Sequence, residues 1–132
     1  MLEPRSNRVL IVDDSPTIRR MVAASLRTLE GVSFEEAGNG LEAIERLSLS
    51  SVTLIVLDLN MPDMHGLEVL RFIRSHERYR NIPTIVLTTR NDSESRDAAI
   101  NAGASLYLTK PFDPKSLLAE VRQLLHNEQR TR

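Results

Sequence analysis

The fold is indicated most clearly by residues 9–16, which read VLIVDDSP. Residues 9–12 form an unbroken apolar run, which is typical of a strand covered on both faces. The pair Ser15-Pro16 places a helix N-cap directly before a proline suited to the first helical turn. The segment therefore predicts a buried strand that leads, through two aspartates, into a helix.

Strand-like runs alternate with helix-period segments along the rest of the chain. The expected strands are residues 9–12, 33–37, 54–57, 85–87 and 106–108. The second and fifth runs are shorter or more polar, so we expect them at the edges of the sheet. The expected helices cover about residues 16–29, 40–47, 67–73, 92–102 and 114–125, and Asn39 with Glu42 resembles a capping box before the second. Five βα units with short loops predict an α/β fold, (βα)5, with a parallel five-stranded sheet and helices on both faces.

Composition limits the possible functions. The 132 residues suit one domain, and the net charge of −1, from 17 basic and 18 acidic residues, argues against direct nucleic-acid or membrane binding. The absence of cysteine excludes disulfides and thiolate sites and agrees with a cytoplasmic location. No apolar run is long enough to span a bilayer, and residues 1–8 do not resemble a signal peptide.

Polar side chains follow four of the expected strands. They are Asp13 and Asp14 after the first, Asp58 after the third, Thr88 after the fourth and Lys110 after the fifth. Each alone could be a helix cap, a turn residue or a solvated charge. Together they are more informative, because the carboxyl ends of parallel strands meet at one edge of a sheet, where open α/β folds bind ligands.

Carboxylates held close together repel one another unless a proton or a cation neutralises them. Hard oxygen ligands without a nearby His or Cys favour Mg²⁺, or Mn²⁺. Such a site suits phosphoryl transfer, in which Asp58, alone at the end of a central strand, is the best candidate for a nucleophile that forms an aspartyl phosphate. Asp13 and Asp14 would then hold the metal, with the backbone carbonyl of Asn60 as a further ligand.

At these residues the chain resembles the receiver domains of two-component response regulators and is similar to the chemotaxis regulators of the CheY type. The segments that carry the resemblance are residues 9–15, 55–62 with Gly66, 86–88, 102–104 and 108–112. The resemblance implies a flavodoxin-like, CheY-like fold with strand order 2-1-3-4-5. It also implies a receiver domain over residues 8–126, flanked by polar termini at 1–7 and 127–132.

The resemblance also implies a role for each site residue. Asp58 corresponds to the phosphoacceptor and a metal ligand, and Asp13, Asp14 and the Asn60 carbonyl correspond to the other Mg²⁺ ligands. Thr88 corresponds to the switch hydroxyl, and Lys110 to the lysine that pairs with the phosphoryl group and precedes a cis Pro111. Tyr107 matches the aromatic residue that turns inward on activation.

The implied partners are a sensor histidine kinase or phosphotransfer protein as donor, and a protein or output domain that reads the phosphorylated state. Such a chain is not an enzyme beyond catalysing its own phosphorylation and dephosphorylation. The expected moving element is the helix at 92–102, in which Ile100 is the only large aliphatic residue. The face formed by this helix, the fifth strand and the last helix could also support a homodimer.

Two residues depart from the commonest family pattern. Thr89 stands where a small Ala or Gly is usual, and Arg90 stands where the chemotaxis regulators have an acidic residue. Both lie next to the switch threonine, so the lifetime of the phosphoryl group stays open.

The same residues bear on three other classes of protein. A phosphatase of the haloacid dehalogenase type would have an acid two residues after its nucleophile, where this chain has Asn60. A flavodoxin would need a hydroxyl- and glycine-rich phosphate loop in place of Asp13-Asp14-Ser15-Pro16. An interaction module that works without phosphorylation would share the fold but would not need the full set of Asp, Thr and Lys.

Overall fold

The chain was described with a computed structural model, which covers residues 6–61 and 64–130, with side chains to His126. Parts of the two predicted polar termini, and Pro62 of the quoted motif, lie outside the described residues. The elements are β1 (Asn7–Val12), α1 (Pro16–Ser25), β2 (Val32–Ala37), α2 (Gly40–Leu49), β3 (Leu54–Leu57), α3 (Gly66–Ser75), β4 (Thr84–Thr88), α4 (Ser93–Asn101), β5 (Leu106–Thr109) and α5 (Pro114–Arg130). The predicted alternation of five strands and five helices is confirmed.

All strand pairings are parallel, and the order across the sheet is β2-β1-β3-β4-β5. This is the order expected from the resemblance, with the two more polar strands at the edges. The register aligns Val12 of β1 with Leu57 of β3, and Thr88 of β4 with Thr109 of β5. The residues that follow these strands therefore meet at one edge of the sheet.

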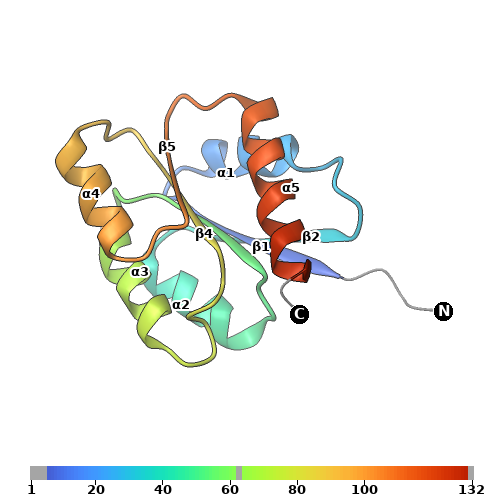
Figure 1. Cartoon of the computed structure of the whole chain (residues 1–132), viewed down its shortest axis with the longest axis horizontal. Helices are drawn as coiled ribbons and strands as arrows, with labels where there is room; N and C mark the ends of the chain where they lie inside the picture. Colours follow the sequence, from blue (N-terminus) through green and yellow to red (C-terminus); the bar gives the residue numbers. More distant parts are fainter. Residues whose placement is uncertain (1–5, 62–63, 131–132) are drawn as a thin grey trace.

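Alternate residues of the central strands enter two separate cores. In β1, Leu10 and Val12 pack with residues of α2, α3 and α4, whereas Val9 and Ile11 pack with residues of α1 and α5. Figure 1 shows the corresponding layers, with α1 and α5 on one side of the sheet and α2, α3 and α4 on the other. Successive side chains of a strand point to opposite faces, so an unbroken apolar run is needed to fill both cores.

Helix starts follow their local sequence, but two helix ends do not follow the pattern, since α5 continues to Arg130, past the expected residue 125, and α1 stops early. Ser15 caps α1 by accepting a hydrogen bond from the Ile18 N–H. The helix ends at Ser25, short of the expected Leu29. The N–H groups of Leu26 and Leu29 bond to carbonyls three residues back, so the chain continues in tighter turns that bury Leu26 and pack the partly buried Leu29 against the same core. The helix-period pattern therefore predicted a helix after Ser15 but not the residue at which it ends.

None of the helices in the described part of the chain combines the length and the apolar character needed to cross a bilayer.

Candidate functional site

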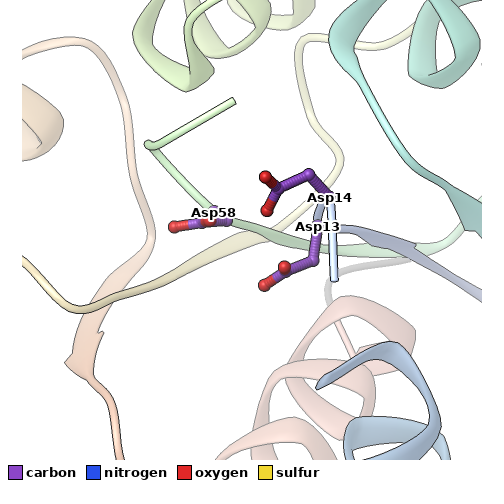
Figure 2. A group of neighbouring side chains, drawn as sticks. All are labelled: Asp13, Asp14 and Asp58. Carbon is purple, nitrogen blue, oxygen red and sulfur yellow. The ribbon is translucent and has the colours of Figure 1, made fainter. Parts of the chain in front are cut away.

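Three carboxylates lie at the carboxyl edge of the sheet, as predicted. Asp13 and Asp14 follow β1, Asp58 follows β3, and these strands are neighbours in the sheet. One oxygen from each of the three side chains lies within 4.8 Å of the others (Figure 2). Asp13 and Asp58 are 3% and 4% exposed, whereas Asp14 is exposed. The cluster is therefore two buried acids with one accessible acid beside them.

Lys110 reaches this cluster from the end of β5. Its Nζ donates a 2.7 Å hydrogen bond to Asp13 Oδ2 and lies 3.6 Å from Asp58 Oδ2. Its backbone N–H bonds to the Thr88 carbonyl, and the Lys110-Pro111 peptide is cis, as the resemblance implied. One ammonium thus faces two buried carboxylates, which leaves the group with a net negative charge when all three acids are ionised.

Asp58 is the least satisfied member of the cluster. Its Oδ1 is buried and has no hydrogen-bond partner among the described residues. Burial raises the pKa of Asp58, the Lys110 charge lowers it, and the Asp13 carboxylate raises it, with a net upward shift. A buried, unpartnered carboxylate oxygen is costly unless another group bonds to it, so this atom is the natural point of attachment for a cation or a new covalent bond.

The three acids fit a hard divalent cation. Carboxylate oxygens are the preferred ligands of Mg²⁺, which keeps several waters and needs few protein ligands. Asp58, with its unpartnered oxygen, and the accessible Asp14 lie close enough together to share one ion. The predicted role of the Asn60 backbone carbonyl as a further ligand stays a prediction.

Thr88 of β4 and Tyr107 of β5 both form hydrogen bonds with the backbone of Arg90, in the segment between β4 and α4. Thr88 is fully buried, and its hydroxyl accepts a hydrogen bond of 3.4 Å from the Arg90 N–H. The Tyr107 hydroxyl donates to the Arg90 carbonyl at 2.7 Å, and its ring is buried in the core under α4. Burial raises the pKa of Tyr107, so its hydroxyl keeps its proton at neutral pH. The predicted switch residues are therefore joined through the backbone of Arg90, with Tyr107 already facing inward.

A polar network spans the rim of the site. Arg90 Nε donates to Asn60 Oδ1 at 2.7 Å, and Asn60 Nδ2 donates to Thr89 Oγ1 at 3.3 Å. The sequence singled out all three positions, but not the bonds between their side chains, because these join loops about thirty residues apart. The two unusual residues, Thr89 and Arg90, are thus connected through Asn60 beside the candidate phosphoacceptor.

Arg19 is a neighbour of the site that sequence reasoning missed. Its Nη1 donates to the Asp13 carbonyl at 2.6 Å, and its Nε donates to Glu36 at 2.7 Å. The sequence offered one indication of this role: Arg19 lies four residues after Ser15, on the first turns of the helix that follows Asp13 and Asp14.

The fold and this site define a class of protein: an open parallel α/β domain with an acidic cluster, a buried threonine and a lysine at the carboxyl edge of its sheet. Residues 9–122 match the family model of the response regulator receiver domain, and the chain belongs to that family. Receiver domains bind Mg²⁺ in an acidic pocket and work with histidine kinases and with output partners in two-component signalling.

The chain is similar to a chemotaxis protein and to a transcriptional regulatory protein. The chemotaxis protein CheY1 of Helicobacter pylori is 36% identical over 119 residues, which cover 89% of this chain and 96% of that protein. The transcriptional regulatory protein SrrA of Staphylococcus aureus is 36% identical over 126 residues, which cover 96% of this chain but 51% of that protein. The chain thus spans nearly the whole of one relative and about half of the other.

Solved structures agree with the fold. The chemotaxis protein CheY4 of Vibrio cholerae has a TM-score of 0.83 at 34% identity, over 91% of this chain and 99% of that one. The signal receiver domain of a histidine kinase from Syntrophus aciditrophicus has a TM-score of 0.87 at 34% identity, over 96% of each chain. Membership in this family favours a receiver over the phosphatase and flavodoxin alternatives.

Proposed function

We propose that this receiver domain carries a signal by Mg²⁺-dependent phosphorylation of Asp58. The donor is a phosphohistidine on a sensor histidine kinase or a phosphotransfer protein. The observation that carries the proposal is the buried Asp58 Oδ1, which has no partner among the described residues and lies in a cluster with Asp13, Asp14 and Lys110. The chain then catalyses only its own phosphorylation and dephosphorylation.

The proposed transfer assigns a role to each member of the cluster. An Asp58 carboxylate oxygen forms the new O–P bond while the P–N bond to the donor imidazole breaks, and its electron pair stays on that nitrogen. Asp13, Asp14, Asp58 and the Asn60 carbonyl would hold Mg²⁺, which when bound stabilises charge on the phosphoryl oxygens. Lys110, 3.6 Å from Asp58 Oδ2, supplies a second positive charge.

The proposed output runs through the Thr88–Arg90–Tyr107 contacts. A phosphoryl group on Asp58 offers new acceptor oxygens to the Thr88 hydroxyl, which now accepts from the Arg90 N–H. A shift of Thr88 therefore disturbs the same segment that the Tyr107 hydroxyl holds, just before α4. The α4-β5-α5 face is the surface that a downstream partner or output domain would read, and phosphorylation biases two existing states of it.

Labelling with a small acyl phosphate tests the proposal. With acetyl phosphate and Mg²⁺, intact-mass spectrometry is expected to show the addition of one phosphoryl group, which EDTA prevents. Asp58→Asn is expected to abolish the addition, and Glu45→Gln, an exposed acid on α2, serves as the matched control. Equal labelling of Asp58→Asn and wild type would contradict the assignment of the nucleophile. No labelling of the wild type by acetyl phosphate or a cognate kinase would favour an interaction module that works without phosphorylation.

A further inference from the structure

Arg19 connects three parts of the molecule next to the acidic cluster. It lies on α1, donates from Nη1 to the Asp13 carbonyl at 2.6 Å, and donates from Nε to Glu36 on β2 at 2.7 Å. Its side chain is 17% exposed, whereas that of Glu36 is 45% exposed. The guanidinium is therefore held in place by Glu36 while it binds a backbone carbonyl within the cluster.

The backbone and side chain of Asp13 are held from several sides. Its N–H bonds to the Ala37 carbonyl, its Oδ1 accepts from the Ser15 N–H, and its Oδ2 accepts from Lys110. The Arg19 bond fixes the one remaining polar atom, the carbonyl oxygen. That carbonyl belongs to the planar peptide that joins Asp13 to Asp14, so its orientation also sets the direction in which the Asp14 backbone leaves.

The position of the Asp14 carboxylate depends on this peptide more than the positions of the Asp13 and Asp58 carboxylates do. It is exposed, so the surrounding core does not restrict its side chain as it restricts Asp13 and Asp58. A rotation of the Asp13–Asp14 peptide would turn the Asp14 carboxylate relative to the other two acids. For a site made of three carboxylates, such a change alters the distance between ligands that one cation must bridge.

We propose that Arg19 is a positioning residue for the divalent-cation site, because it fixes the peptide between Asp13 and Asp14. This inference rests on the Mg²⁺ site of the proposed function. Arginine suits the role better than lysine, since its planar guanidinium donates in two fixed directions at once, here to a carbonyl and to a carboxylate. Groups that orient metal ligands commonly change metal affinity by about 10- to 100-fold when they are removed.

The test must separate position from charge, because Arg19 is itself a cation near a cation site. The double variant Arg19→Met/Glu36→Gln removes one positive and one negative charge and leaves the local net charge unchanged. Its Mg²⁺ dissociation constant, measured by calorimetric titration, is expected to rise about tenfold. Glu36→Gln alone keeps a side-chain oxygen that can accept from Arg19 Nε, and with it the bond from Nη1 to the Asp13 carbonyl, so its dissociation constant is expected to stay within about twofold of wild type.

Arg19→Lys provides a second measurement that does not depend on the double variant's stability. It keeps the positive charge but not the two fixed directions, so a severalfold weaker Mg²⁺ affinity is expected. If the double variant is unfolded at the assay temperature, this variant decides: weaker binding supports the proposal and unchanged binding overturns it. Thermal unfolding in EDTA is recorded for every variant.

The possible outcomes are distinguishable. Wild-type Mg²⁺ affinity in both the double variant and Arg19→Lys would overturn the positioning role, even if both unfold at a lower temperature. An affinity for Glu36→Gln as weak as that of the double variant would also overturn it, because the ion pair and not the carbonyl bond would then be responsible. Absence of Mg²⁺ binding by the wild type would contradict the proposed function itself.

Discussion

At the scale of single residues, Asp58 is under opposing demands. Reactivity requires a carboxylate with a free oxygen, and stability disfavours a buried charge without partners. Lys110 relieves part of this conflict, but Asp13 and burial act against it, and the net result is a raised pKa. A group whose pKa is raised on folding contributes stability below its unfolded pKa, and this contribution is lost as the pH rises through the folded value. Deprotonation of Asp58 therefore destabilises the cation-free protein.

Asp58→Asn is expected to stabilise the protein at neutral pH in EDTA by on the order of 1 kcal/mol, because it removes a buried charge with an unsatisfied oxygen. The difference from wild type is expected to shrink as the pH falls through the raised pKa of Asp58, where the acid is neutral as well. Chemical denaturation at several pH values checks both statements. A variant that is less stable than wild type at neutral pH would mean that Lys110 more than compensates for burial.

At the scale of elements, α4 is packed differently from its neighbours. Ala99 is its buried residue, and Ile100 is 45% exposed, whereas α3 buries Val69, Leu70 and Ile73. A helix with few buried contacts can be displaced at a low cost in free energy. The segment before α4 carries the Thr88 and Tyr107 contacts to Arg90, so the site reaches this helix through its amino-terminal end.

Amide exchange tests whether α4 is the moving element. Addition of beryllofluoride and Mg²⁺, as a mimic of the phosphoryl group, is expected to change protection between Asp92 and Tyr107. Protection in α2 is expected to stay the same and serves as the internal reference. Unchanged exchange from Asp92 to Tyr107, under conditions where the mimic is shown to bind, would contradict a switch through this helix.

The far end of α4 is attached by Arg74 of α3. Its guanidinium donates to the carbonyls of Gly103 at 2.9 Å and Ile82 at 2.8 Å. Burial lowers the pKa of Arg74. The ordinary pKa of an arginine is so high, however, that the guanidinium stays charged. A side chain at Gly103, which has a φ of +111°, would meet the Arg74 stem at 2.6 Å, so glycine is required there for both conformation and space.

Arg74→Met is expected to destabilise the protein by about 2 kcal/mol, because charged hydrogen bonds to two backbone carbonyls are lost together. Arg71→Met, at an exposed position on the same helix, is the matched control and is expected to change stability little. Urea denaturation of the two variants gives the comparison. Equal effects would show that the Arg74 contacts add nothing beyond a surface arginine.

At the scale of the whole molecule, the α4-β5-α5 face is the proposed surface for output. Ile100 of α4 is its exposed large aliphatic side chain among the described residues, at 45% exposure, and Leu118 and Leu124 of α5 are partly buried beside Leu117 and Val121. Partly exposed apolar residues on neighbouring elements are typical of surfaces that bind a partner or a second copy.

Sedimentation velocity tests the homodimer version of this surface. With beryllofluoride and Mg²⁺ the chain is expected to associate, and Ile100→Ser is expected to weaken the association. Leu49→Ser, a more exposed aliphatic residue on α2, is the matched control because α2 is not part of this face. A purely monomeric phosphoryl-mimic state would rule out the homodimer and leave a different protein as the partner.

Much of this molecule follows from local sequence. An apolar run such as residues 9–12 must be covered on both faces, and Ser15-Pro16 must start a helix, so the alternation of elements and the parallel sheet were predictable. The parallel sheet then brings Asp13, Asp58 and Lys110 to one edge, because all its strands end on the same side. The meeting of these three side chains at one edge was therefore predictable without coordinates, whereas the contact of Arg19 with Asp13 was not.

The bonds within the site depend on distances between segments far apart in the chain. The Lys110–Asp13 contact joins residues 97 positions apart, and Asp58 Oδ1 is buried without a hydrogen-bond partner in the described part of the chain. The hydrogen bond from Arg19 to the Asp13 carbonyl and the Arg90–Asn60 bond across the rim also depend on the tertiary structure. Residue type and periodicity determine which side chains arrive at the edge, whereas only three-dimensional packing determines which of their oxygens are bonded to other described residues and which are not.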